Sequence, residues 1–204
     1  ILGKAMLAHQ IERLKQARLL NKIVVATSSH SADDNIEKLC DSIGVECFRG
    51  QLDNVLDRYY QVAKIHQPNH IVRVTGDCPL IDSDIVDQVI ELHLQSNADY
   101  TSNCNPPTLP DGLDVEVFNF SALKTAWFNS KKPSEKEHVT PYIRNNHQLF
   151  QQQNFNYHQD LSLYRWTVDE PEDFELINNI YQELYPKNPY FKLDDILKLL
   201  KIVK

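Results

Sequence analysis

The chain has 204 residues, 42% of them hydrophobic, and a formal net charge of −7. This length favours a single domain with its own core, and the acidic balance argues against nucleic acid as a partner, since nucleic-acid binding requires a basic patch. Its four cysteines form no C-x-x-C pair, and no apolar run reaches the length of a membrane span. We therefore expect neither a zinc site nor a disulfide framework, and no membrane partner. A cytoplasmic protein is expected.

The N-terminal segment predicts a helix rather than a strand. The apolar residues from Leu7 onward have helical spacing as far as Asn21. The sequence starts with Ile1 rather than with a methionine. We expect a first helix that ends near Asn21 and a natural protein that begins earlier.

The first half of the chain alternates between short β-branched runs and amphipathic segments. The pattern predicts strands at 23–27, 45–48 and 71–75, and helices at 31–43, 55–63 and 83–97. This alternation predicts a mostly parallel α/β sheet with right-handed crossovers.

The pattern changes after residue 99. The sequence predicts a strand at 100–103, a rigid proline-rich loop at 106–112, a strand of period two at 113–118, a helix at 121–129, a weak strand at 150–157, a strand at 164–168 and helices at 174–184 and 194–203. Because the alternation at 113–118 implies one buried face, this strand is expected in an antiparallel or edge position.

Two aspartates stand out because each follows a predicted strand and is followed two residues later by proline. They are Asp77, after the run 71–75, and Asp169, after the run 164–168. If both strands belong to one sheet, the two carboxylates lie at the same edge and share one Mg²⁺, which commonly takes one or two protein carboxylates and completes its shell with water and phosphate. The alternative is that each aspartate only caps the helix that follows.

A third acidic motif, Asp82-Ser83-Asp84, matches the Asp-x-Asp pattern of glycosyltransferases that use nucleotide sugars. Its position directly before an amphipathic segment favours helix capping instead.

Four segments together resemble one family. They are 74–82, 110–116, 137–144 and 165–173, and in this order they resemble the spore-coat-polysaccharide type of cytidylyltransferase, which is related to the CMP-sugar synthetases for sialic acid and for 3-deoxy-manno-octulosonate. The resemblance implies a Rossmann-like nucleotide-diphospho-sugar transferase fold, with a mixed, mostly parallel sheet flanked by helices. It also implies transfer of CMP from CTP to a sugar, with release of pyrophosphate, in the biosynthesis of surface polysaccharide precursors.

The same resemblance implies roles for individual residues. Asp77 and Asp169 would be catalytic and would bind Mg²⁺. The nucleotide would be bound by Asp57, Arg58, Arg73, Thr75 and Gly76, and the sugar by His138 and Arg144. Structural alternatives remain open for three of these: Arg73 on the wet face of its strand, His138 as a half-buried helix residue and Arg144 as a surface residue.

The family begins with a strand and a phosphate-binding loop, and this chain starts after them. We therefore expect residues 1–204 to form a single nucleotidyltransferase-like domain that is incomplete at its N-terminus. The resemblance implies a homodimer, with residues 100–120 as the candidate dimerisation segment. Two alternative functions remain: a nucleotide-sugar-dependent glycosyltransferase and a non-catalytic binding or dimerisation protein.

Overall fold

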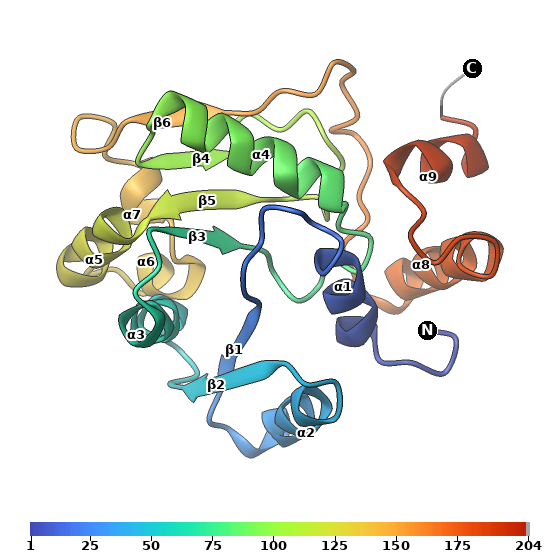
Figure 1. The fold of residues 1–204 in the computed structure, drawn as a ribbon, viewed down its shortest axis with the longest axis horizontal. Coiled ribbons are helices and arrows are strands. Elements are labelled where there is room, and N and C mark those ends of the chain that lie inside the picture. Colours follow the sequence, from blue (N-terminus) through green and yellow to red (C-terminus); the bar gives the residue numbers. More distant parts are fainter. Residues whose placement is uncertain (203–204) are drawn as a thin grey trace.

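The structure, a computed structural model, describes residues 1–202, which form helices and strands that alternate in the first half of the chain (Figure 1). In chain order the elements are α1 (Met6–Leu14), β1 (Val24–Ser28), η1 (Ser31–Asp33), α2 (Asp34–Ser42), β2 (Glu46–Gly50), α3 (Val55–His66), β3 (His70–Arg73), α4 (Ser83–Ser96), β4 (Tyr100–Ser102), β5 (Glu116–Asn119), α5 (Phe120–Asn129), α6 (Pro133–His138), α7 (Pro141–Arg144), β6 (Gln152–Asn154), α8 (Pro171–Leu184) and α9 (Leu193–Leu199). Within the described residues, none of these helices is both long and apolar enough to cross a lipid bilayer.

The strands form two sheets. β1 and β2 pair in parallel, and the second sheet has the order β3-β5-β4-β6. In the second sheet β5 runs antiparallel to both neighbours, while β4 and β6 are parallel. The α/β architecture with mixed strand directions is as predicted, but the prediction of a mostly parallel sheet is wrong: among the described residues two strand pairs are parallel and two are antiparallel, because the period-two strand runs against both of its neighbours.

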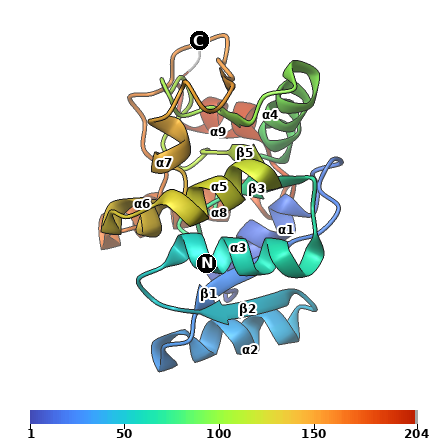
Figure 2. The ribbon, with the colours of Figure 1, turned by 90° about the vertical axis from the view of Figure 1, so that its left-hand side faces the viewer.

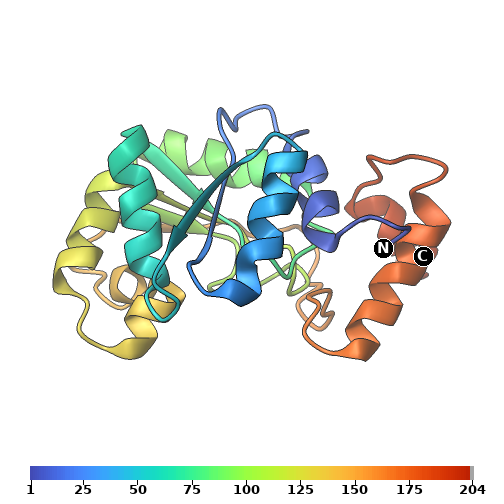
Figure 3. The ribbon, with the colours of Figure 1, turned by 90° about the horizontal axis from the view of Figure 1, so that it is seen from below.

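Helices cover both sheets and close one end of the molecule. α2 lies on the outer side of β1 and β2 (Figure 2), and α4 runs across β4 and β5 (Figure 1). α8 and α9 stand together at one end, next to α1 and the N-terminus (Figure 3). The first and last parts of the chain therefore meet in space.

β5 divides the core into two clusters, because successive side chains of a strand point to opposite faces. Val117 belongs to the cluster built with α4, α8 and α9, while Phe118 belongs to the cluster built with α3 and α5. Both side chains are fully buried.

The first helix is shorter than the sequence predicted. It ends at Leu14 rather than near Asn21. The reason is a tertiary contact, because the backbone N–H groups of Arg18 and Leu19 donate to the two carboxylate oxygens of the buried Asp87 on α4, each at 3.0 Å.

Two further predictions need correction at the C-terminal end. Residues 164–168 do not form a strand: they make only an isolated bridge between Arg165 and Asp111, in which Trp166 N–H donates to the Asp111 carbonyl at 2.6 Å. The predicted helix 194–203 is α9 (Leu193–Leu199), and position 203 lies outside the described residues.

The candidate dimerisation segment, 100–120, is largely internal. Leu113 and Phe118 are fully buried within the chain, whereas Asp114 is partly exposed. Asn105, Pro106 and Pro107, in the proline-rich loop, are exposed, and the role of residues 100–120 in dimerisation stays a prediction. The homodimer itself stays a prediction.

Candidate functional site

The Asp77 loop, residues 74–82, leaves the end of β3 and is held by side chains from both ends of the chain. From α1, Gln10 donates to the Thr75 carbonyl at 2.6 Å, and Arg13 donates to the Ile81 carbonyl at 2.8 Å. From α8, the hydroxyl of Tyr181 donates to the Pro79 carbonyl at 2.7 Å. Because these bonds go to three backbone carbonyls of the loop, they fix its path next to α1 and α8.

Asp82, at the end of this loop, is structural. One carboxylate oxygen accepts from the N–H of Asp84 at 2.8 Å and caps α4, and the other accepts from the N–H of Leu193 at 2.7 Å. The side chain is almost fully buried. The capping interpretation of Asp82-Ser83-Asp84 is therefore confirmed.

The structure brings the segments of Asp77 and Asp169 together. The N–H of Val168 donates to the Asp77 carbonyl at 2.9 Å, which places the two acidic segments side by side. The prediction that Asp169 ends a strand is wrong, and this single backbone bond makes the connection instead. Asp169 is about half exposed and forms an ion pair with Arg165, which also binds Asp173 at 2.7 Å.

Close backbone packing at Gly112 seats the Asp169 segment. Gly112 has φ +103°, and a Cβ atom there would lie 2.7 Å from the carbonyl carbon of Trp166. Only glycine combines this conformation with so close an approach. Glycine at position 112 is thus required for residues 164–168 to lie where they do.

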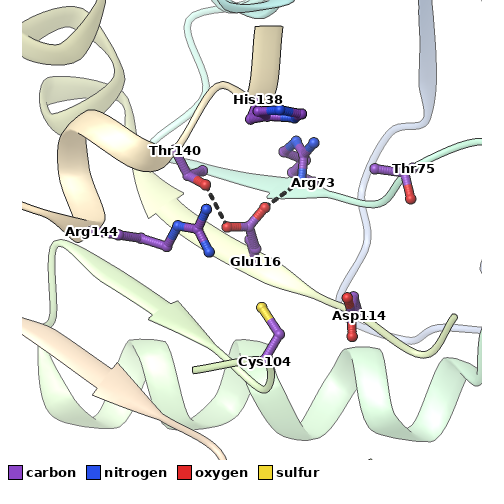
Figure 4. A pocket seen from close by; sticks show the side chains of 8 residues that line it. All are labelled: Arg73, Thr75, Cys104, Asp114, Glu116, His138, Thr140 and Arg144. Atoms are coloured by element: carbon purple, nitrogen blue, oxygen red, sulfur yellow. Dashed lines mark hydrogen bonds and ion pairs between the residues drawn. The ribbon is translucent and has the colours of Figure 1, made fainter. Parts of the chain in front are cut away.

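A cavity of about 160 Å³ opens beside the Asp77 loop (Figure 4). Its lining comes from β3, β5, α6, α7 and the connecting loops: Arg73, Thr75, Cys104, Asp114, Glu116, His138, Thr140 and Arg144. Four residues predicted from the sequence, Arg73, Thr75, His138 and Arg144, are therefore gathered around one cavity.

Glu116 occupies the centre of this lining and is fully partnered. It pairs with Arg73, its direct neighbour across β3 and β5. Its other oxygen accepts from the hydroxyls of Tyr100 and Thr140, each at 2.6 Å. The charge of Arg73 is thereby compensated inside the protein, and its largely buried side chain shows that the interpretation as a residue on a wet strand face is wrong. Nucleotide binding by Arg73 stays a prediction.

Arg144 differs from Arg73. Its guanidinium points into the cavity (Figure 4), and no carboxylate of residues 1–202 lies within ion-pair distance of it. Since Arg73 already compensates Glu116, the cavity keeps a cationic group that is available to a ligand.

Asp114 is a site residue that the sequence reasoning missed. Burial, together with the nearby charges of Asp111, Glu116 and Asp77, raises the pKa of its carboxyl to about 6. The signal was available, because Asp114 and Glu116 are two positions apart on a period-two strand and share a face.

These carboxylates fit a hard cation. Asp77 and Asp114 concentrate negative charge beside the cavity, and no ion pair to Asp77 occurs within residues 1–202. In the described chain no three His, Cys, Asp or Glu side chains form a complete metal cage. Magnesium does not require one, because it retains waters and substrate phosphates in its shell. Binding of this ion by Asp77 and Asp169 stays a prediction, and in the structure Asp169 is paired with Arg165.

The remaining predicted nucleotide ligands lie elsewhere. Asp57 accepts from the indole N–H of Trp127 at 2.8 Å, and Arg58 donates to the carbonyls of Gln51 and Leu52 at 2.8 and 3.1 Å. Neither lines the cavity, and their observed bonds order the α3 region. Gly76 is exposed in the Asp77 loop. Nucleotide binding by these three residues stays a prediction.

Comparison with known proteins identifies relatives over most of the chain. The sequence profile of the family described as Cytidylyltransferase matches residues 1–191. The uncharacterized protein MJ1063 of Methanocaldococcus jannaschii is 45% identical over 140 residues, which are 69% of this chain and 56% of that protein. The spore coat polysaccharide biosynthesis protein SpsF of Bacillus subtilis is 32% identical over 197 residues, or 93% of this chain and 80% of SpsF.

A solved structure of a cytidylyltransferase has the same fold as this chain. The structure of a cytidylyltransferase from Leptospira borgpetersenii superposes with a TM-score of 0.92 at 33% identity, covering 98% of this chain and 84% of that one. The match in sequence and the match in fold both run through the Asp77 loop, the cavity and the Asp169 segment. The chain therefore belongs to the cytidylyltransferase family.

Proposed function

We propose that this protein transfers CMP from CTP to a hydroxyl of a sugar acid and releases pyrophosphate, with Mg²⁺ as cofactor. The observation that carries the proposal is the bond from Val168 N–H to the Asp77 carbonyl, which sets the two acidic segments side by side next to the cavity. Membership of the cytidylyltransferase family supports CTP as the donor.

In the proposed reaction a sugar oxygen attacks the α-phosphorus of CTP. The new P–O bond forms as the bond from the α-phosphorus to the bridging oxygen breaks, the electron pair leaves with pyrophosphate, and the proton of the sugar hydroxyl passes to water. Magnesium, when bound, would neutralise charge on the phosphates. Asp77 and Asp169 would hold the ion, while the fixed Asp77 loop would keep the reacting groups in line.

Arg144 supports an acidic acceptor. Its guanidinium faces the cavity without an ion-pair partner among the described residues. A planar guanidinium binds a carboxylate through two parallel hydrogen bonds, which a neutral sugar does not offer. We therefore assign Arg144 to the carboxylate of the acceptor and the cavity to the body of the sugar.

The test is pyrophosphate release by the full-length protein with CTP, Mg²⁺ and a panel of sugar acids and neutral sugars. We expect Asp77→Asn to lower the rate by roughly 10²-fold or more, because it removes charge at the site of phosphoryl transfer. Asp41→Asn makes the same chemical change at an exposed position of α2 and should leave the rate unchanged. Undiminished turnover of Asp77→Asn would contradict the proposal, and release of a nucleoside diphosphate would indicate glycosyl transfer instead.

The acceptor assignment has its own test. Arg144→Gln should raise KM for the sugar acid by about tenfold or more while KM for CTP stays near its original value, because one charge-assisted contact contributes on the order of 1.5–3 kcal/mol. Arg144→Lys should recover only part of the loss, since an ammonium lacks the planar fork. An equal effect on neutral sugars would refute the role of a carboxylate.

A further inference from the structure

The cavity lining carries two opposite charges that its internal ion pair leaves over. Besides His138, the lining has two arginines and two carboxylates. Arg73 and Glu116 form an ion pair and so compensate each other. Arg144 and Asp114 remain, and no hydrogen bond or ion pair joins either of them to another lining residue (Figure 4). The cavity therefore presents one positive and one negative charge to its ligand.

These two charges are separated in space. Arg144 belongs to α7, whereas Asp114 precedes β5, and the two side chains lie on opposite sides of Glu116 in the view of Figure 4. They form no ion pair with each other, and within residues 1–202 neither has another ion-pair partner. A ligand that spans the cavity therefore meets a cation at one end and a carboxylate at the other.

The environment of Asp114 favours a positive partner over a neutral one. Burial and the negative charges of Asp111, Glu116 and Asp77 raise the pKa of its carboxyl to about 6, so at pH 7 the group is still mostly charged. A partly buried charge among like charges is stabilised by an opposite charge, which a neutral hydroxyl does not bring. The charge of Arg73 acts in this direction, but it is the smallest of the named influences.

We propose that the acceptor is an amino sugar acid, whose ammonium group binds Asp114 while its carboxylate binds Arg144. This inference rests on the proposed function and narrows the acceptor from sugar acids in general to zwitterionic ones. An ammonium group donates hydrogen bonds and supplies the missing charge together. The N-acetylated form of the same sugar keeps an N–H donor but has no charge, so experiment can separate the two contributions.

The test measures pyrophosphate release by the full-length protein with CTP, Mg²⁺ and a series of compounds derived from 3-deoxy-manno-octulosonate. Each derivative has one hydroxyl, other than the reacting one, replaced by an amino group. The parent sugar acid and the N-acetylated form of each derivative are the references. We expect at least one amino derivative to exceed both references in kcat/KM by about tenfold or more, because a hydrogen bond to a charged partner is roughly twice as strong as a neutral one.

A variant of Asp114 shows whether this preference comes from its charge. Asp114→Asn should lower the ratio of kcat/KM for the favoured amino derivative to that for the parent by about tenfold or more. Because the readout is a ratio, an effect of the variant on folding or on the chemical step changes both values and cancels. Asp41→Asn, the same change at an exposed position of α2, should leave the ratio unchanged.

The outcomes distinguish this inference from the proposed function. If the parent reacts and no amino derivative exceeds it, the inference is overturned and the proposed function stands. The same holds if Asp114→Asn lowers kcat/KM equally for amino derivative and parent, which is the result expected of a residue that binds the metal or the nucleotide. If none of the sugar acids yields pyrophosphate, the proposed function itself is contradicted, and the inference with it.

Discussion

Asp114 gives a prediction in which a variant becomes more stable. Burial and neighbouring carboxylates raise the pKa of this side chain from 3.8 to about 6. A raised carboxyl pKa means that the fold disfavours the charged form, so the protein loses stability as pH rises from about 4 to about 6. By linkage the loss reaches roughly 3 kcal/mol at pH 7, about 1.5 kcal/mol at pH 5 and well under 1 kcal/mol at pH 4.

Asp114→Asn removes the charge and keeps the shape, so the variant should regain these amounts. The free energy of unfolding, measured by urea denaturation in EDTA, should exceed that of the original protein by up to about 3 kcal/mol at pH 7 and by about half as much at pH 5. The corresponding rise in Tm at pH 7 is roughly 6–12 °C for a domain of this size.

The control for Asp114→Asn is Asp41→Asn, at an exposed position, which should change the free energy of unfolding by less than about 0.5 kcal/mol at either pH. The reasoning is refuted if Asp114→Asn is no more stable than the original protein at pH 7. It is also refuted if the gain is the same at pH 5 and pH 7, because the effect would then have no connection with ionisation.

Two further variants test packing and charge by urea denaturation. Gly112→Ala should lower the free energy of unfolding by at least about 2 kcal/mol, because its Cβ atom would meet the Trp166 backbone at positive φ. Gly76→Ala, with open space around it, should change the free energy of unfolding by less than about 1 kcal/mol. Equal effects of the two variants would contradict the role of the close approach. Glu116→Gln should lower the free energy of unfolding by about 3–5 kcal/mol, because it leaves Arg73 without its counter-charge. The double variant with Arg73→Met should recover part of this loss. Unchanged stability of Glu116→Gln would show that the ion pair is not needed.

Local patterns predicted the elements but not every pairing between them. The strand at 113–118 was expected in an antiparallel or edge position because alternation suggests that only one face is buried. β5 is antiparallel to both neighbours, but it is a central strand with Val117 and Phe118 buried on opposite faces, so the expected wet face was wrong. The run 164–168 has equal strand character, yet it makes one bridge, because strand formation also needs a free neighbouring edge at the right place. That condition lies in distant residues and not in the run itself.

For the candidate site, too, the sequence predicted some residues and missed others. Asp77 and Asp169 were paired by their shared local sequence, and their segments are adjacent, although through Val168 rather than through a common sheet edge. Asp114 and Glu116 were missed because alternation indicates which residues share a face but not that this face forms the wall of a cavity. Asp57 was predicted from a pairwise motif, whereas its position depends on Trp127, 70 positions later in the chain.

The side chains that hold the Asp77 loop reduce the entropy that the loop would lose when substrate binds. A free loop would lose conformational entropy at the moment of substrate binding, at about 1–2 kcal/mol for each ordered residue. Here Gln10, Arg13 and Tyr181 hold the loop carbonyls already, so that entropy is lost once, during folding. Preorganisation of the acidic loop thus resides in side chains of α1 and α8 that bond only to its backbone. Residues of α1 and α8, which are far apart in the sequence, therefore contribute to the rate by holding this loop in position.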